Sequence, residues 1–280
     1  MSAVKNSWGG LGVERVEDRL VLTASASFVD ASFIAGTLTL TGDNLNDTFS
    51  IQQVTVGQGK SAVQELEISG SRGTQLTSNN QTLTLDAHGR IFVPTSDAVT
   101  GISVMLGTGN NNVTISKLTT LAPATIAITD SGAAGNNYVR INGVSGATAL
   151  TATLGTGNDS LIVGGSSLAS VSATLASGVN FNDNVQLNSV NVSGTTAITT
   201  GAGIDRVALN GDPGRPHSIY TGAVTVSLGA GNDHALVNNA AFSSTLNIDG
   251  ISGNDFATGY AKMNKSNLTV VNATNQIHTR

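Results

Sequence analysis

The sequence predicts an all-β chain folded as a parallel β-helix, also called a β-solenoid, with coils of about 22–28 residues. The first observation is a frame that recurs eight times, in which Asn (once Ile) precedes Asp or Asn and apolar residues usually follow two and four positions later. The second is the spacing, because from Asn111 onward the second residue of the frame recurs every 22 to 28 residues. The third is the composition, which is 39% hydrophobic but only 4% aromatic, and small β-forming residues suit a narrow stacked core.

Each frame predicts a turn followed by a half-buried strand. Side chains of a strand alternate between its two faces, so the apolar residues after Asn158-Asp159, which are Leu161 and Val163, share one face. A second alternating strand precedes several of the turns, as at 102–106, 150–154 and 224–228. Units of this size cannot bury their apolar faces alone, so we expect each coil to stack on its neighbours, with the right-handed crossover usual for parallel strands.

The period divides the chain into three segments, an export or capping segment at 1–26, irregular first coils at 27–110 and regular coils at 111–280. The regular frame is interrupted at 52–101, where four further strand patterns are joined by Gly- and Asn-rich turns. This stretch fits either two irregular coils or a hairpin that projects from one coil, and we favour the hairpin.

The N-terminal segment allows two interpretations. Basic residues, a short apolar run and the triplet 24–26 (Ala-Ser-Ala) are features of an export signal, whereas Val13, Val16 and Leu20 on one helical face would cap the first coil. Residues 16–24, V-E-D-R-L-V-L-T-A, resemble the LEPR-XLL segment that precedes large repeat-rich secreted or surface proteins of certain environmental bacteria. Val16 stands where that segment has Leu, and Asp18 where it commonly has Pro. The resemblance implies export and a place at the cell surface.

The first residue of the frame predicts a ladder of side-chain amides. Coils stacked about 4.8 Å apart place equivalent residues directly over one another. Each Asn amide could then bind the next, and Asn also tolerates the left-handed backbone of a tight turn. Ile204 interrupts this column, which contains Asn46, Asn110, Asn136, Asn158, Asn182, Asn232 and Asn254.

The second residue of the frame forms a column of carboxylates, Asp47, Asp159, Asp183, Asp205, Asp233 and Asp255. Stacked like charges repel, so we expect these side chains to point into water, to cap turn amides or to share cations. The sequences G-T-G-N-D at 155–159 and G-A-G-N-D at 229–233 resemble the RTX calcium repeat, which implies Ca²⁺ held between coils by Asp159, Asp183, Asp205, Asp233 and Asp255. RTX units, however, recur every nine residues, and one Asp per coil supplies few of the six to eight oxygens that Ca²⁺ needs. We therefore expect no cofactor, with Ca²⁺ as the alternative.

A loop at 210–222 carries the most varied side chains of the chain. Its candidate recognition residues are Asp212, Arg215, His217 and Tyr220, because insertions in a solenoid gather on one face and often bind partners. An ordinary Pro- and Gly-rich surface loop is the alternative. Catalysis is not expected, since the four His are scattered and no Glu follows Glu67, although stacked carboxylates have a separation close to that of retaining glycosidases.

Charge and hydropathy narrow the remaining classes of function. A net charge of −5 with only 13 Lys and Arg argues against nucleic acid as a partner, and no stretch approaches the ~18 apolar residues of a transmembrane helix. We therefore expect an extracellular or cell-surface β-solenoid with a structural or adhesive role, whose partners are other surface or matrix proteins or polysaccharide. A calcium-binding module and a carbohydrate-binding or carbohydrate-cleaving β-helix are the alternatives.

Overall fold

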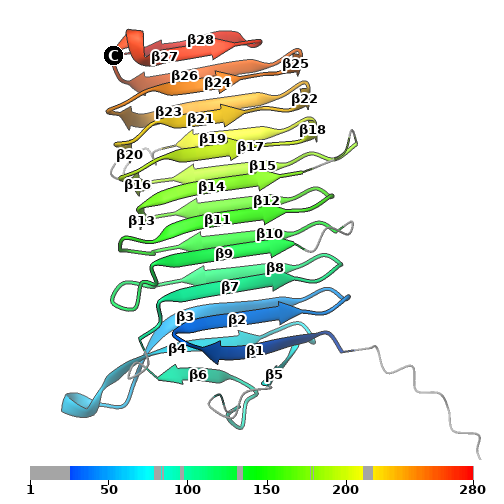
Figure 1. Cartoon of the computed structure of the whole chain (residues 1–280), viewed down its shortest axis with the longest axis vertical. Helices are drawn as coiled ribbons and strands as arrows, with labels where there is room; N and C mark the ends of the chain where they lie inside the picture. The colour runs from blue at the N-terminus through cyan, green and yellow to red at the C-terminus, as the bar shows by residue number, and fades with distance from the viewer. Residues whose placement is uncertain are drawn as a thin grey trace, which may run out of the picture.

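The computed structural model describes residues 26–78, 83, 85–94, 98–130, 135–176, 178, 180–210 and 217–279. In these residues the chain is all-β, and its parallel coils stack into a β-solenoid of about 7 turns. Figure 1 shows the coils lying one above another along the long axis. The predicted fold class is therefore confirmed.

Two long sheets form the walls of the solenoid, and each coil contributes a strand to both. Sheet A runs, in spatial order, through β5 (Gln75–Ser78), β1 (Phe28–Ile34), β2 (Thr37–Gly42), β7 (Gly101–Leu106), β9 (Thr125–Asp130), β11 (Ala149–Leu154), β14 (Ser170–Leu175), β17 (Thr196–Thr199), β21 (Val224–Ser227), β24 (Leu246–Asp249) and β27 (Leu268–Val271). From β2 to β27 every pairing is parallel.

The strands that follow the turns of the Asn-Asp frame belong to sheet B. Its main path contains β6 (Ile91–Pro94), β4 (Val63–Gly70), β3 (Thr48–Val56), β8 (Asn112–Ser116), β10 (Tyr138–Asn142), β12 (Ser160–Gly164), β15 (Asn184–Asn188), β19 (Arg206–Asn210), β23 (His234–Phe242), β26 (Phe256–Lys262) and β28 (Thr274–Thr279). The short strands β13 (Ser167–Leu168), β16 (Asn191–Val192) and β20 (Ser218–Tyr220) join it at β23.

Smaller elements complete the coils. A third sheet contains β18 (Ala202–Gly203), β22 (Ala230–Gly231) and β25 (Ser252–Gly253), and the 3-10 helices are η1 (Gly59–Ser61) and η2 (Lys265–Asn267). Over the described residues, no helix has the length and apolar character needed to cross a bilayer.

The register of the parallel strands places the apolar residues of the frame in one continuous core. Val139 of β10 pairs with Val113 of β8 on one side and Leu161 of β12 on the other, and all three are fully buried. The apolar residues of sheet A that the alternation predicted to point inward, such as Leu150 and Leu154, are also buried. The period-two interpretation of both strand sets is confirmed.

The N-terminal end departs from the parallel stack, as the interrupted period predicted. β3 and β4 form an antiparallel hairpin in which Phe49 lies opposite Gly70 and Val56 opposite Val63. β4 then pairs antiparallel with β6, and β1 with β2. The stretch therefore contains the hairpin that we favoured. Segment 1–25 lies outside the described residues, and so do most of residues 81–85, which are one of the four further strand patterns expected within 52–101.

Candidate functional site

The turns that lead from sheet A to sheet B place the repeated Gly, Asn and Asp residues in three stacked columns. In the glycine column, Gly203 has φ +152° and Gly231 has φ +151°, a backbone conformation that side chains disfavour. A Cβ on Gly231 would lie 1.6 Å from the carbonyl oxygen of Gly203 in the preceding coil. The Asn residues of the frame are absent from the left-handed region, so our expectation for them is wrong. In five coils the glycine that precedes the frame has a positive φ and permits the close approach of the coils; these glycines are Gly109, Gly157, Gly203, Gly231 and Gly253.

The second residues of the frame form an inner ladder of hydrogen bonds between coils. The backbone N–H of each one donates to the side-chain Oδ1 of its equivalent in the following coil. The distances are 2.9 Å from residue 47 to 111, 3.3 Å from 111 to 137, 2.8 Å from 137 to 159, 3.0 Å from 159 to 183, 2.8 Å from 183 to 205, 2.7 Å from 205 to 233 and 2.8 Å from 233 to 255. The acceptor is an Asn at 111 and 137 and an Asp in the other five bonds. The Asp column therefore caps turn amides, one of its three expected roles, but the amides belong to the adjacent coil rather than to the local turn.

The first residues of the frame form an outer ladder with the opposite direction. Here the backbone N–H of each coil donates to the Asn Oδ1 of the preceding coil, at 2.7 Å for Asn110 and Asn46 and 2.9 Å for Ile204 and Asn182. Among the described residues of this column, Asn158 alone adds an amide-to-amide bond, from its Nδ2 to Asn136 Oδ1. The predicted column is present, but its Asn side chains bind mainly backbone N–H groups rather than one another. Ile204 interrupts it as expected, because its side chain offers no acceptor.

The Asp side chains of the inner ladder are buried rather than directed into water. Their exposed fractions are 0–2%. At Asp159, Asp205, Asp233 and Asp255 the second oxygen, Oδ2, has no hydrogen-bond partner among the described residues. Burial is the largest cause of the raised pKa of Asp159, to about 7, and of Asp233, to about 6. A neutral form of these carboxyls therefore becomes accessible near neutral pH.

The arrangement offers few ligands to a cation. Each carboxyl of the inner ladder already accepts a backbone N–H, and successive members belong to different coils. In the part of the chain that the structure describes, no three His, Cys, Asp or Glu side chains come together as a metal-binding group. Asp159, Asp183, Asp205, Asp233 and Asp255 thus form a line rather than a cluster, whereas Ca²⁺ needs six to eight oxygens around one point.

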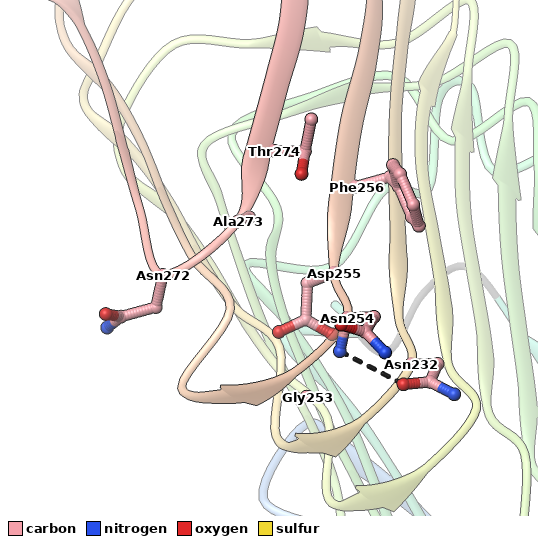
Figure 2. A pocket seen from close by; sticks show the side chains of 8 residues that line it. All are labelled: Asn232, Gly253, Asn254, Asp255, Phe256, Asn272, Ala273 and Thr274. Atoms are coloured by element: carbon pink, nitrogen blue, oxygen red, sulfur yellow. Dashed lines mark hydrogen bonds between the residues drawn. The ribbon is translucent and has the colours of Figure 1, made fainter.

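The inner ladder ends in an open hollow of about 610 Å³ at the C-terminal coil, shown in Figure 2. The register of β26 and β28 places Ala273 at the position that Asp255 has in the coil before it. Ala273 has no side-chain acceptor, so the ladder stops at Asp255. The outer ladder bond of this coil, from the N–H of Asn254 to Oδ1 of Asn232, is 3.0 Å long.

The structure describes two of the four candidate recognition residues of the 210–222 loop. Asp212 and Arg215 lie outside the described residues, and His217 is exposed with its Nδ1 hydrogen-bonded to Asn239 Oδ1. Tyr220 is fully buried and stacks on Phe242, with ring centroids 5.0 Å apart. The surface role expected for Tyr220 is therefore wrong, because its position in β20 faces inward.

His217 instead borders a hollow of about 410 Å³, which sequence reasoning missed. Its other polar lining residues are Asn239, Tyr260 and Lys262. These residues come from successive coils, and only the pairing of β20, β23 and β26 brings them together. The sequence could have revealed this hollow only if the return loops had been aligned correctly, and these loops lack the Asn-Asp frame that aligns the turns.

Comparison with protein-family models, with curated proteins and with solved structures finds no match to this chain. The arguments about function therefore depend on the geometry described above.

Proposed function

We propose that the chain is a secreted or cell-surface β-solenoid with a structural or adhesive role, a stiff rod that holds its coils in fixed register. The observation that carries this proposal is the pair of ladders. Repeated Asn and Asp residues in an uncharacterised chain suggest ligands, yet here their Oδ1 atoms bind the backbone of the adjacent coil. The Asn and Asp residues that recur regularly along the sequence therefore hold adjacent coils together.

Two further observations support this role. The core is one continuous column of apolar residues that spans the coils, so each coil is packed between its neighbours as in other solenoids. The segment at 16–24 resembles the LEPR-XLL motif, which is associated with export and the cell surface. Partners of such a rod would be other surface or matrix proteins or polysaccharide.

Surface labelling of intact cells of the source organism tests the proposal. We expect a membrane-impermeant amine reagent to label the chain on intact cells, through exposed lysines such as Lys117 and Lys265. A cytoplasmic protein labelled only after lysis is the matched reference. Recovery of this chain solely among the proteins labelled after lysis would contradict the proposed location.

A further inference from the structure

The outer face of sheet A carries a regular array of small hydroxyl and methyl side chains. Across β9, β11, β14, β17 and β21, the residues between the buried positions point outward and pair in register from coil to coil. The rows are Thr125, Ala149 and Ser170; Ala127, Thr151, Ser172, Ala197 and Thr225; and Thr129, Thr153, Thr174, Thr199 and Ser227. Every one of these residues is Thr, Ser or Ala, so this array has neither charge nor a long side chain. Met105 of β7 borders the array at one end, and Asn247 and Asp249 of β24 border it at the other.

The outer face of sheet B, in the same coils, differs in composition. Its outward positions include Tyr138, Arg140, Gln186, Arg206 and His234. Solvent exposure alone therefore does not dictate small residues in this solenoid. The restriction to small side chains is therefore specific to the outer face of sheet A in these coils.

The array is stiff and periodic in two directions. Neighbouring coils lie about 4.8 Å apart and alternate residues of a strand about 6.7 Å apart. Thr has few χ1 rotamers and Ala has none, so little side-chain entropy is lost when the face binds. Figure 1 shows the strands of sheet A side by side with little rotation from coil to coil, so the rows extend along the stack.

The chemistry of this face excludes several kinds of ligand. Across β9, β11, β14, β17 and β21 the array has no charge to attract an ionic partner, no aromatic ring on which a sugar could stack, and no large apolar side chain of the kind that anchors protein interfaces. A ligand that matches it must itself have a flat, periodic surface that accepts and donates hydrogen bonds at fixed intervals.

We propose that this array on the outer face of sheet A binds ice. The coil spacing is close to the repeat of oxygen positions along one axis of hexagonal ice, and the spacing of alternate residues is comparable with the perpendicular repeat. Hydroxyl groups can occupy positions of lattice water, while the methyl groups of Thr and Ala order the water between them. This activity goes beyond the structural role and requires only that the face be exposed.

The test is partition of the purified chain into slowly growing ice. We expect the wild-type chain to be enriched in the ice fraction and the double variant Thr153→Tyr/Thr174→Tyr to lose that enrichment by about tenfold or more, which corresponds to ~1.4 kcal/mol. Thr153 and Thr174 are exposed and pair across β11 and β14. Tyr is favourable in strands, so the change adds bulk to the face without opposing the fold.

The matched control is Ile162→Tyr/Gln186→Tyr, at an adjacent outward pair on sheet B. It should partition like wild type, and circular dichroism melts should show all three proteins folded. Equal loss in both double variants, or wild-type partition no better than that of an unrelated soluble protein, would overturn the proposal. Wild-type binding to crystalline cellulose or chitin without entry into ice would assign the face to polysaccharide instead. A dimer in sedimentation that the face variant abolishes, again without entry into ice, would assign it to a second copy.

Discussion

Replacing Asp159 by Asn should stabilise the solenoid at alkaline pH. Asp159 is 1% exposed, and burial raises its pKa to about 7, against the hydrogen bonds from Asn137. The substitution keeps the Oδ1 that accepts the Asn137 N–H and removes the charge. The native ladder already contains this arrangement, because Asn137 Nδ2 donates to Asp159 Oδ1 at 3.1 Å. An Asn at 159 could donate to Asp183 in the same way.

The magnitude follows from the pKa of Asp159. An unfolded aspartate has a pKa of about 3.9, so a shift of roughly three units at 1.36 kcal/mol each gives about 4 kcal/mol. Because the folded pKa is the higher one, the folded chain binds the additional proton. The stabilisation is complete below about pH 4 and is lost as the pH rises through about 7. Asp159→Asn should therefore raise the free energy of unfolding by about 2–4 kcal/mol near pH 8, after local relaxation, and leave it almost unchanged near pH 4.

Urea denaturation followed by circular dichroism at both pH values measures this difference. The matched control is Asn182→Asp, which keeps the Oδ1 acceptor for the Ile204 N–H but places the new charge at an exposed position. It should change the free energy of unfolding by less than about 1 kcal/mol at either pH. A destabilised Asp159→Asn chain near pH 8, or the same gain at both pH values, would refute the assignment of the inner ladder as a buried, partly protonated column.

Four further predictions concern the buried core, the glycine turns, calcium binding and export. Val185→Asp should destabilise the chain by several kcal/mol, because it buries an unpaired charge, whereas Gln186→Asp on the outward side of β15 should be nearly silent; equal thermal melts would contradict the period-two assignment. Gly231→Ala should lower the free energy of unfolding by about 2 kcal/mol or more, since its Cβ would meet a carbonyl of the preceding coil, and an unchanged melt would contradict the close stacking of the turns. In calcium titrations Asp233→Asn should behave like wild type; tight wild-type binding that this variant abolishes would establish the calcium module. Mass spectrometry of protein from its native host should place the mature N-terminus near residues 25–27, and an intact N-terminus in a cytoplasmic fraction would contradict export.

The sequence was sufficient to predict the fold and the positions of the two ladders. Alternation placed Val139 and Leu161 on the buried face, and the spacing of the frame placed Asp159 and Asp183 in one column. The burial of those carboxylates was not predictable, because a lone Asp is rarely buried. Burial follows here from stacking, which gives each carboxylate a backbone N–H of the adjacent coil.

Positions that depend on register between return loops were harder to predict. Tyr220 looked like a loop residue among prolines and glycines, yet the pairing of β20 with β23 turns it inward against Phe242. The Thr, Ser and Ala rows of sheet A were also missed. Alternation identifies outward residues one strand at a time, and only the coil-to-coil register aligns them as an array.

Because the two ladders run in opposite directions, one coil can be added to the stack or removed from it as a complete unit. Apart from the coils of Ile204 and Ala273, each coil of the frame presents an acceptor from its outer Asn to the coil after it and an acceptor from its inner residue to the coil before it. Asn111 and Asn137 show that either an amide or a carboxylate satisfies the inner position. A gene that duplicates or deletes one whole unit of about two dozen residues therefore leaves matching acceptors and donors at the new junction. Lengthening or shortening such a rod requires no compensating change elsewhere in the stack.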